Sequence, residues 1–319
     1  MAETPHPRET DVLEGCEVQV AAFEDALARG RMHHAWLLTG PEGVGKATFA
    51  HHAAFRLLGA ADTIRLNPEE QAVRLARAGA HPDLTVLERP VENGRVKKVI
   101  PVDEARRLPE FFAKSPSVAQ ARVAIIDAAD DMNPNAANAV LKILEEPPAN
   151  AVLFLVSHSP GRLLDTIRSR CRKLRFPPWE AGAITAFLER RGVGGDQASR
   201  LAALSGGGPG LAWRLAGTEA LDLADLAERL VEGPPPPDAE LIQASDRFRG
   251  ADGADRFEFL FNALADQVRR RAEAGGGERD ADLWRDLSRA VDDADAINLD
   301  RAEVFLGLAG RLKGQGAHA

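Results

Sequence analysis

The segment that most constrains the fold is TGPEGVGKATFA, residues 39–50, which lies between a short apolar run and a helix-like stretch. The apolar run HAWLLTG, residues 34–40, is typical of a buried strand, and the stretch after residue 45 favours a helix that stops near Gly59. A strand, a glycine-rich turn and a helix in this order are the setting of a phosphate-binding loop. The candidate phosphate-binding residues are therefore Gly40, Gly43, Gly45 and Lys46.

The position after the lysine departs from this motif. A working loop carries Ser or Thr there to ligate Mg²⁺, whereas this chain has Ala47. Thr48 is the next hydroxyl and is kept as a candidate of a degenerate nucleotide site. Because one helical step rotates a side chain by about 100°, we expect Thr48 to point away from the phosphates. The pattern predicts a retained loop that has lost metal-dependent hydrolysis.

A second apolar run, RVAIIDAAD at residues 122–130, also lacks a catalytic group. Asp127 stands where a Walker B aspartate would help to hold Mg²⁺, so it is a further candidate of the degenerate site. The next residue is Ala128, where many such ATPases carry Glu, and no carboxylate is left there to polarise an attacking water. The alternative is that Asp127 and Asp130 are loop or cap residues.

The first half of the chain alternates strands and helices. After the second run, Asn133 can cap a helix that continues to Pro147, and AVLFLVS at residues 151–157 predicts a third strand. This alternation predicts an α/β fold with a parallel sheet covered on both faces. The second half shows helical periodicity alone, with one apolar stripe formed by Phe257, Leu260, Phe261, Leu264 and Val268.

Composition excludes several classes of protein. The chain has 319 residues, of which 45% are hydrophobic, and no run approaches the ~18 apolar residues of a membrane span. Cys16 and Cys171 are the two cysteines, which predicts reduced thiols, a cytoplasmic location, and neither a zinc site nor any other metal site. The net charge of −8 argues against a protein that binds nucleic acid on its own.

Basic residues gather in TIRSRCRKLRF, residues 166–176, where a predicted helix meets a strand. A solvated basic cluster is the simplest interpretation. A guanidinium suits phosphate through its bidentate geometry and permanent charge, so an arginine at such a corner can also serve the nucleotide of a neighbouring subunit. The sequence leaves both interpretations open for Arg168, Arg170, Arg172 and Lys173.

Several of these segments together resemble one family. GPEGVGKAT, HPDL, VAIIDAADDMNPNAANAVLKILEEPP and LFLVSHSPGRLLDTIRSRC are similar to the delta-prime family of bacterial DNA polymerase III clamp-loader subunits. The resemblance is dense from about residue 9 to residue 177 and looser beyond. It implies an AAA+ P-loop domain at residues 9–177, a small helical lid at 178–216 and an all-helical collar for oligomerisation at 217–316.

The resemblance also implies a function and partners. Delta-prime subunits do not hydrolyse ATP, and Arg170 in the triplet with Ser169 would act as an arginine finger on ATP held by an adjacent gamma or tau subunit. The partners would be gamma or tau and delta, and indirectly the sliding clamp and primer–template DNA. No cofactor would be required, although passive ATP binding stays open. The alternatives are a catalytically active gamma-like AAA+ ATPase and a stand-alone nucleic-acid-binding adaptor.

Overall fold

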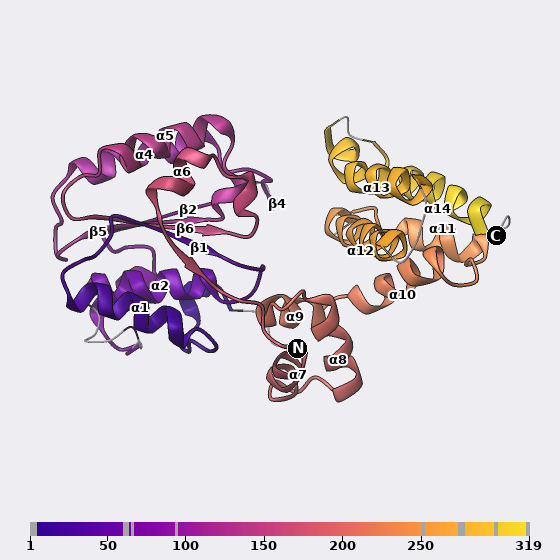
Figure 1. Ribbon diagram of the computed structural model, residues 1–319, viewed down its shortest axis with the longest axis horizontal. Helices are drawn as coiled ribbons and strands as arrows, with labels where there is room; N and C mark the ends of the chain where they lie inside the picture. Colours follow the sequence, from indigo (N-terminus) through magenta and orange to yellow (C-terminus); the bar gives the residue numbers. More distant parts are fainter. Residues whose placement is uncertain are drawn as a thin grey trace. The chain divides into compact units, whose positions relative to one another are not determined.

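The fold is given by a computed structural model, which describes residues 5–59, 64, 67–92, 95–250, 253–273, 278–296 and 299–316. The chain divides into two compact units, Met1–Arg214 and Leu215–Ala319. Figure 1 shows a mixed sheet-and-helix architecture in the first unit and helices in the described part of the second.

A five-stranded parallel sheet forms the centre of the first unit, in the order β2–β5–β6–β1–β7. Leu37 of β1 lies opposite Leu155 of β6, so the strand that leads into the glycine-rich loop is central and buried. The three strands expected from the sequence are confirmed. The strands are β1 (Ala35–Thr39), β2 (Leu84–Glu88), β5 (Arg122–Asp127), β6 (Ala151–Ser157) and β7 (Arg172–Arg175), with a separate antiparallel pair β3 (Val91–Glu92) and β4 (Arg95–Val96).

Helices cover both faces of the sheet, as the parallel pairing requires. Figure 1 shows α1 (Glu17–Ala28) and α2 (Lys46–Leu57) on one face and α4 (Val102–Ala113), α5 (Pro134–Glu145) and α6 (Asp165–Arg170) on the other. The short helix α3 (Gln71–Arg77) packs into the same core as α1 and α2.

Two separate apolar cores result, because successive side chains of a strand point to opposite faces. Trp36 packs in the core under α1 and α2, whereas Leu37 packs in the core under α4, α5 and α6. The two cysteines are divided in the same way, since Cys16 is buried in the first core and Cys171 in the second.

The ends of α5 follow from its sequence. The side-chain oxygen of Asn133 accepts a hydrogen bond from the N–H of Ala136 at 2.8 Å, and Pro134 occupies the first turn. The helix ends at Glu145, just before a pair of prolines that cannot continue it. The predicted cap and stop are confirmed.

The HPDL segment before β2 has a structural explanation. Asp83 has no exposed surface, and its carboxylate accepts hydrogen bonds from the N–H groups of Ser117 (2.8 Å), Val118 (2.8 Å) and Ala119 (3.0 Å). The guanidinium of Arg122 lies 3.5 Å away. Burial alone would raise the pKa of Asp83, but the three donors and Arg122 hold it below its ordinary value. Asp83 therefore fixes the chain that enters β5.

We predict that Asp83→Asn lowers the free energy of unfolding by about 2 to 3 kcal/mol at pH 7, because it removes a charged acceptor from buried donors. A group with a lowered pKa stabilises the fold above its unfolded pKa of about 3.9, and that contribution is lost as the pH falls through the folded value. Urea unfolding of both proteins between pH 7 and pH 3 measures this. A difference that stays constant down to pH 3 would contradict the role of the charge.

The remaining described elements are helical. The first unit continues with α7 (Ala181–Glu189) and α8 (Gly195–Leu204), and it ends within α9 (Pro209–Ala216). The expected stripe of α12, from Phe257 to Val268, is confirmed as core. The second unit contains α10 (Ala220–Val231), α11 (Asp238–Asp246), α12 (Gly253–Glu273), α13 (Glu278–Ala296) and α14 (Arg301–Gly316).

The predicted boundary between lid and collar, at residues 216 and 217, stays a prediction: α9 ends at Ala216, while the division into compact units falls after Arg214. Among the described residues, no helix combines the length and the apolar character that a membrane span needs.

Candidate functional site

The glycine-rich loop joins the end of β1 to the start of α2, which begins at Lys46. Gly43 and Gly45 have φ of 73° and 101°, in a region that L side chains rarely adopt. These two glycines therefore let the loop turn back over the N-terminus of α2, where unpaired N–H groups favour an anion.

Lys46 is buried within the loop that it would serve. It is 2% exposed, and its Nζ donates to the carbonyl oxygens of Gly40 at 2.7 Å and Pro41 at 2.5 Å. Burial lowers the pKa of Lys46 to about 8, although the carboxylates of Asp127 and Glu42 favour its charged form. Two of the three ammonium protons are thus used by the loop itself, and one remains for a ligand.

Asp127 ends β5 close enough to Lys46 for each charge to affect the other. Burial and the nearby carboxylate of Glu88 raise the pKa of Asp127 to about 6, and Lys46 opposes this shift. The following residue, Ala128, is 4% exposed and carries no acid. The sequence pattern thus placed Asp127 at the loop correctly, and the position of a general base next to it is filled by a methyl group.

Asp130 has a different role from Asp127. Its carboxylate accepts hydrogen bonds from the hydroxyl of Ser157 at 2.8 Å and from the N–H of His158 at 2.5 Å. Asp130 therefore ties the end of β6 to the segment that follows β5. The Ser157 hydroxyl is thus already engaged by this carboxylate.

These elements border a cavity of about 650 Å³. Gly43, Gly45, Lys46 and Asp127 line it, as do both Ala47 and Thr48. Thr48 thus lies nearer the site than the rotation argument implied. The cavity, the loop N–H groups and Lys46 fit a phosphate-bearing ligand, but Ala47 gives no hydroxyl to a bridging Mg²⁺. The site suits binding better than hydrolysis.

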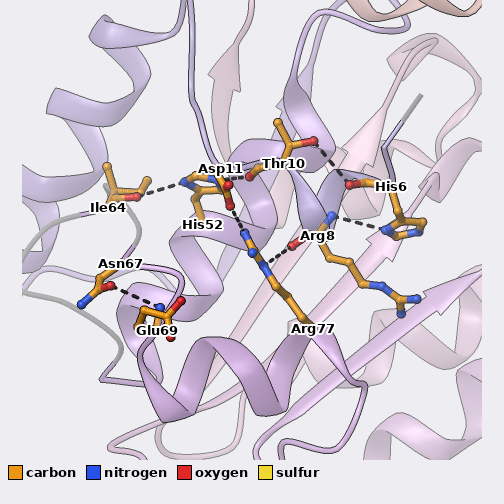
Figure 2. Close-up of polar contacts among 9 residues, drawn as sticks. All are labelled: His6, Arg8, Thr10, Asp11, His52, Ile64, Asn67, Glu69 and Arg77. Carbon is orange, nitrogen blue, oxygen red and sulfur yellow. Dashed lines mark hydrogen bonds and ion pairs between the residues drawn. The ribbon is translucent and has the colours of Figure 1, made fainter. Parts of the chain in front are cut away.

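The N-terminal segment supplies one wall of this cavity, through residues such as His6, Thr10 and Leu13. Figure 2 shows how that segment is held. The two ring nitrogens of His52 in α2 face two carbonyl oxygens, that of Thr10 at 2.8 Å and that of Ile64 at 3.1 Å, and the neutral ring donates to one of them. Arg77 in α3 donates to the carbonyl oxygen of Arg8 at 3.0 Å and to the carboxylate of Asp11 at 2.5 Å (Figure 2).

His52 is 1% exposed, and these contacts give it a structural role. The sequence did not predict the wall itself, because the segment has no periodicity and its anchors lie 42 and 69 residues further along the chain.

The start of α9 also lines the cavity, and it packs directly on the loop. The N–H of Gly210 donates to the carbonyl oxygen of Gly43 at 2.8 Å. A Cβ at Gly43 would collide with the backbone of Leu211, and a Cβ at Gly208 would collide with the carbonyl oxygen of Glu42. The SGGGPG sequence of residues 205–210 thus reflects backbone-to-backbone packing of the helix on the loop.

Arg214, one turn into α9, forms an ion pair with Glu42 of the loop. Burial disfavours the ionised form of Glu42, but Arg214 outweighs it and holds the pKa of Glu42 below its usual value. The structure places Arg214 at the rim of the cavity, paired with the loop.

Ser169 and Arg170 form a separate candidate site at the C-terminal end of α6. Ile167 and Cys171 are buried on either side of them, which fixes this end of the helix on the sheet. The Arg170 side chain is 37% exposed, and its guanidinium contacts Glu145 Oε1 at 3.1 Å and the carbonyl oxygen of Thr166 at 3.1 Å. The Ser169 hydroxyl donates to the same carbonyl at 3.2 Å.

The other arginines of the cluster have partners of their own. Arg168 pairs with Asp165 of the same helix, and the guanidinium of Arg172 lies 4.5 Å above the ring of Trp36. The basic cluster is therefore not a uniform patch. Neither Ser169 nor Arg170 is among the residues that line the cavity, so the predicted site residues fall into two groups.

The parallel sheet, the glycine-rich loop and the adjoining helices define a P-loop domain that has Ala47 after the loop lysine and Ala128 after Asp127. Residues 16–180, about half of the chain, match the family described as DNA polymerase III, delta subunit. The chain belongs to this family.

Named relatives agree with this assignment. The chain is 41% identical over 205 residues to DNA polymerase III subunit delta′ of Pseudomonas aeruginosa. The aligned region covers 62% of this chain and 60% of that protein. It is 37% identical over 191 residues to the delta′ subunit of Escherichia coli, covering 58% and 55%. The matched region thus spans somewhat more than half the length of these relatives.

A solved structure shares the fold. A DNA polymerase III gamma subunit-related protein from Thermotoga maritima aligns with a TM-score of 0.51 over 94% of this chain and 99% of that one. At 16% sequence identity, this similarity concerns the fold alone.

Proposed function

We propose that this chain is a non-hydrolysing subunit of the DNA polymerase III clamp loader. In this role it supplies Arg170 to ATP bound by an adjacent gamma or tau subunit, so that the sliding clamp is loaded on primed DNA. One observation carries the proposal. The chain keeps the glycine-rich loop, but it has Ala47 where a Mg²⁺-binding hydroxyl is expected and Ala128 where a catalytic acid is expected. Membership of the delta family supports the assembly part of the proposal.

The proposed chemistry is division of labour between subunits. As the γ-phosphoryl group leaves, negative charge grows on its oxygens, and a guanidinium stabilises that charge most in the transition state. Arg170 lies on a helix end fixed by buried Ile167 and Cys171, and more than a third of its side chain is exposed to a partner. The cavity at Lys46 can bind a nucleotide passively, and neither zinc nor another cofactor is part of the proposal.

The thiols give a reason to leave zinc out. Cys16 and Cys171 are buried in cores on opposite faces of the sheet, so they cannot ligate one metal ion. Structural zinc sites take four close ligands. Among the described residues, no three His, Cys, Asp or Glu side chains are gathered as a metal site would require.

Reconstitution tests the assembly part of the proposal. We expect the purified chain to enter a stable complex with gamma or tau and delta subunits of its own organism, and we expect that complex to load the clamp on primed DNA. Omitting this chain should abolish loading. A complex that forms and loads the clamp equally well without it would overturn the proposal.

We predict that the isolated chain shows no ATPase activity above background, because it has neither a Mg²⁺ hydroxyl at residue 47 nor an acid at residue 128. Phosphate release is the measurement, and Lys46→Ala is the control for a contaminating ATPase. A turnover of about 1 s⁻¹ or more that Lys46→Ala removes would favour the gamma-like ATPase instead. Weak binding of ADP or ATP is compatible with the proposal.

A DNA-binding measurement on the isolated chain distinguishes the proposed function from the remaining alternative, a stand-alone nucleic-acid-binding adaptor. A stand-alone adaptor would bind DNA with an affinity that falls steeply as salt rises. The net charge of −8 opposes such binding. We expect the isolated chain to show none at physiological salt.

A further inference from the structure

A contact between the ends of α5 and α6 holds the side chain of Arg170. Arg170 is the last residue of α6, and Glu145 is the last residue of α5. Their side chains meet with Nη2 of Arg170 at 3.1 Å from Oε1 of Glu145. Nη1 donates at the same distance to the carbonyl oxygen of Thr166, one turn back in the same helix. The guanidinium plane is thus held at two of its nitrogens by two different helices.

Both anchors stand on fixed parts of the fold. Ile143 and Leu144 precede Glu145 in the core, and Ile167 and Cys171 fix the last turn of α6 in that same core. The main chain at Glu145 is therefore fixed, and its carboxylate can move only by side-chain rotation. An arginine has several rotatable bonds, and without a second partner its tip samples many positions.

Position matters more than stability for such a pair. Side-chain exposure is 37% for Arg170 and 50% for Glu145, and exposed ion pairs contribute little to folding. A charge aimed at a reacting phosphoryl group, by contrast, must lie at the right place, and misplacement by about 1 Å can cost up to ~100-fold in rate. The ion pair therefore contributes little to the stability of the fold, but it can contribute to function by positioning Arg170.

We propose that Glu145 is a positioning residue for Arg170, and this inference rests on the function proposed above. Glu145 fixes the direction of the guanidinium before the neighbour's ATP arrives, so that less freedom is lost when the transition state forms. It does not touch the nucleotide. Its effect should therefore appear in the rate of hydrolysis at the adjoining site and pass entirely through Arg170.

The test uses the complete reconstituted complex in which the other ATP sites are disabled, with DNA-stimulated single-site hydrolysis as the measurement. We expect Glu145→Ala to lower kcat by about tenfold with little change in KM. Glu145→Asp, which keeps the negative charge, should recover part of this loss, whereas the neutral Glu145→Gln should recover little, because the contact with Nη2 is an ion pair. Glu146→Ala removes the same charge from the next exposed residue, for which we expect no effect.

A double-mutant cycle separates positioning from a structural role. In an Arg170→Ala background, Glu145→Ala should cause no further loss. An unchanged or increased kcat for Glu145→Ala alone would overturn the inference, and so would the same fold-loss in both backgrounds. If Arg170→Ala itself leaves the rate unchanged, the proposed function fails and the inference fails with it. A loss for Arg170→Ala beside an unaffected Glu145→Ala overturns the positioning role alone.

Discussion

In a reconstituted complex whose other ATP sites are disabled, Arg170→Ala should slow hydrolysis at the adjoining site by about 10³-fold to 10⁵-fold, the range of arginine fingers in other phosphoryl-transfer systems. The reason is electrostatic, because in the proposed function the guanidinium would contact oxygens whose charge grows in the transition state. Nucleotide binding at that site should weaken far less. In the unmodified complex the fall in total ATPase activity should be partial, since only one site loses its arginine.

Two control variants sharpen this prediction. Arg170→Lys should restore little of the rate, because a point charge cannot replace the planar fork that contacts two oxygens. Arg172→Ala should have a much smaller effect, since its guanidinium lies on the ring of Trp36 and loses a cation–π contact of about 0.5 to 1 kcal/mol. Assembly should survive in all three, as measured by gel filtration. Unchanged single-site rates for Arg170→Ala would return the arginine to the role of a solvated surface group.

The second large effect is expected at the contact between the glycine-rich loop and α9. Gly43→Ala should destabilise the first unit by about 3 kcal/mol, because the methyl group collides with Leu211 and the residue keeps a φ of 73°. The corresponding fall in its melting temperature is about 6 to 12 °C. Differential scanning calorimetry of the full chain measures this change.

Gly45 offers a matched control in the same loop. It too has a positive φ, 101°, but a Cβ there would meet nothing within 4 Å. Gly45→Ala should therefore cost about 1 kcal/mol, which is the backbone strain without the collision. The difference between the two variants measures how tightly α9 packs on the loop. Equal costs would mean that α9 does not rest on Gly43 in solution.

Several elements of the first unit could be predicted from local sequence. Three examples depend only on contacts between residues close in sequence. They are the strand before the loop, the end of α2 near Gly59 and the cap at Asn133. Apolar runs and caps report on burial and on chain ends, and they do so within a few residues. The stripe from Phe257 to Val268 was predictable for the same reason.

The surroundings of the site were not predictable in this way. Gly208 looks like a turn residue in the sequence, but its small size is needed where it meets Glu42, more than 160 residues earlier. The N-terminal wall and the pair of Glu145 with Arg170 depend likewise on contacts between distant segments. A single sequence carries no signal for such pairs, because each partner alone is an ordinary polar or small residue.

The burial of the two cysteines makes the chain a ready background for spectroscopy. Burial raises the pKa of the Cys16 thiol to about 11 and that of Cys171 to about 12, so neither forms the reactive thiolate at neutral pH. A cysteine introduced at an exposed position would therefore be the first to react with a maleimide dye. Fluorophores could be attached without deleting either native thiol, and distances to a labelled partner could be followed while the complex turns over ATP.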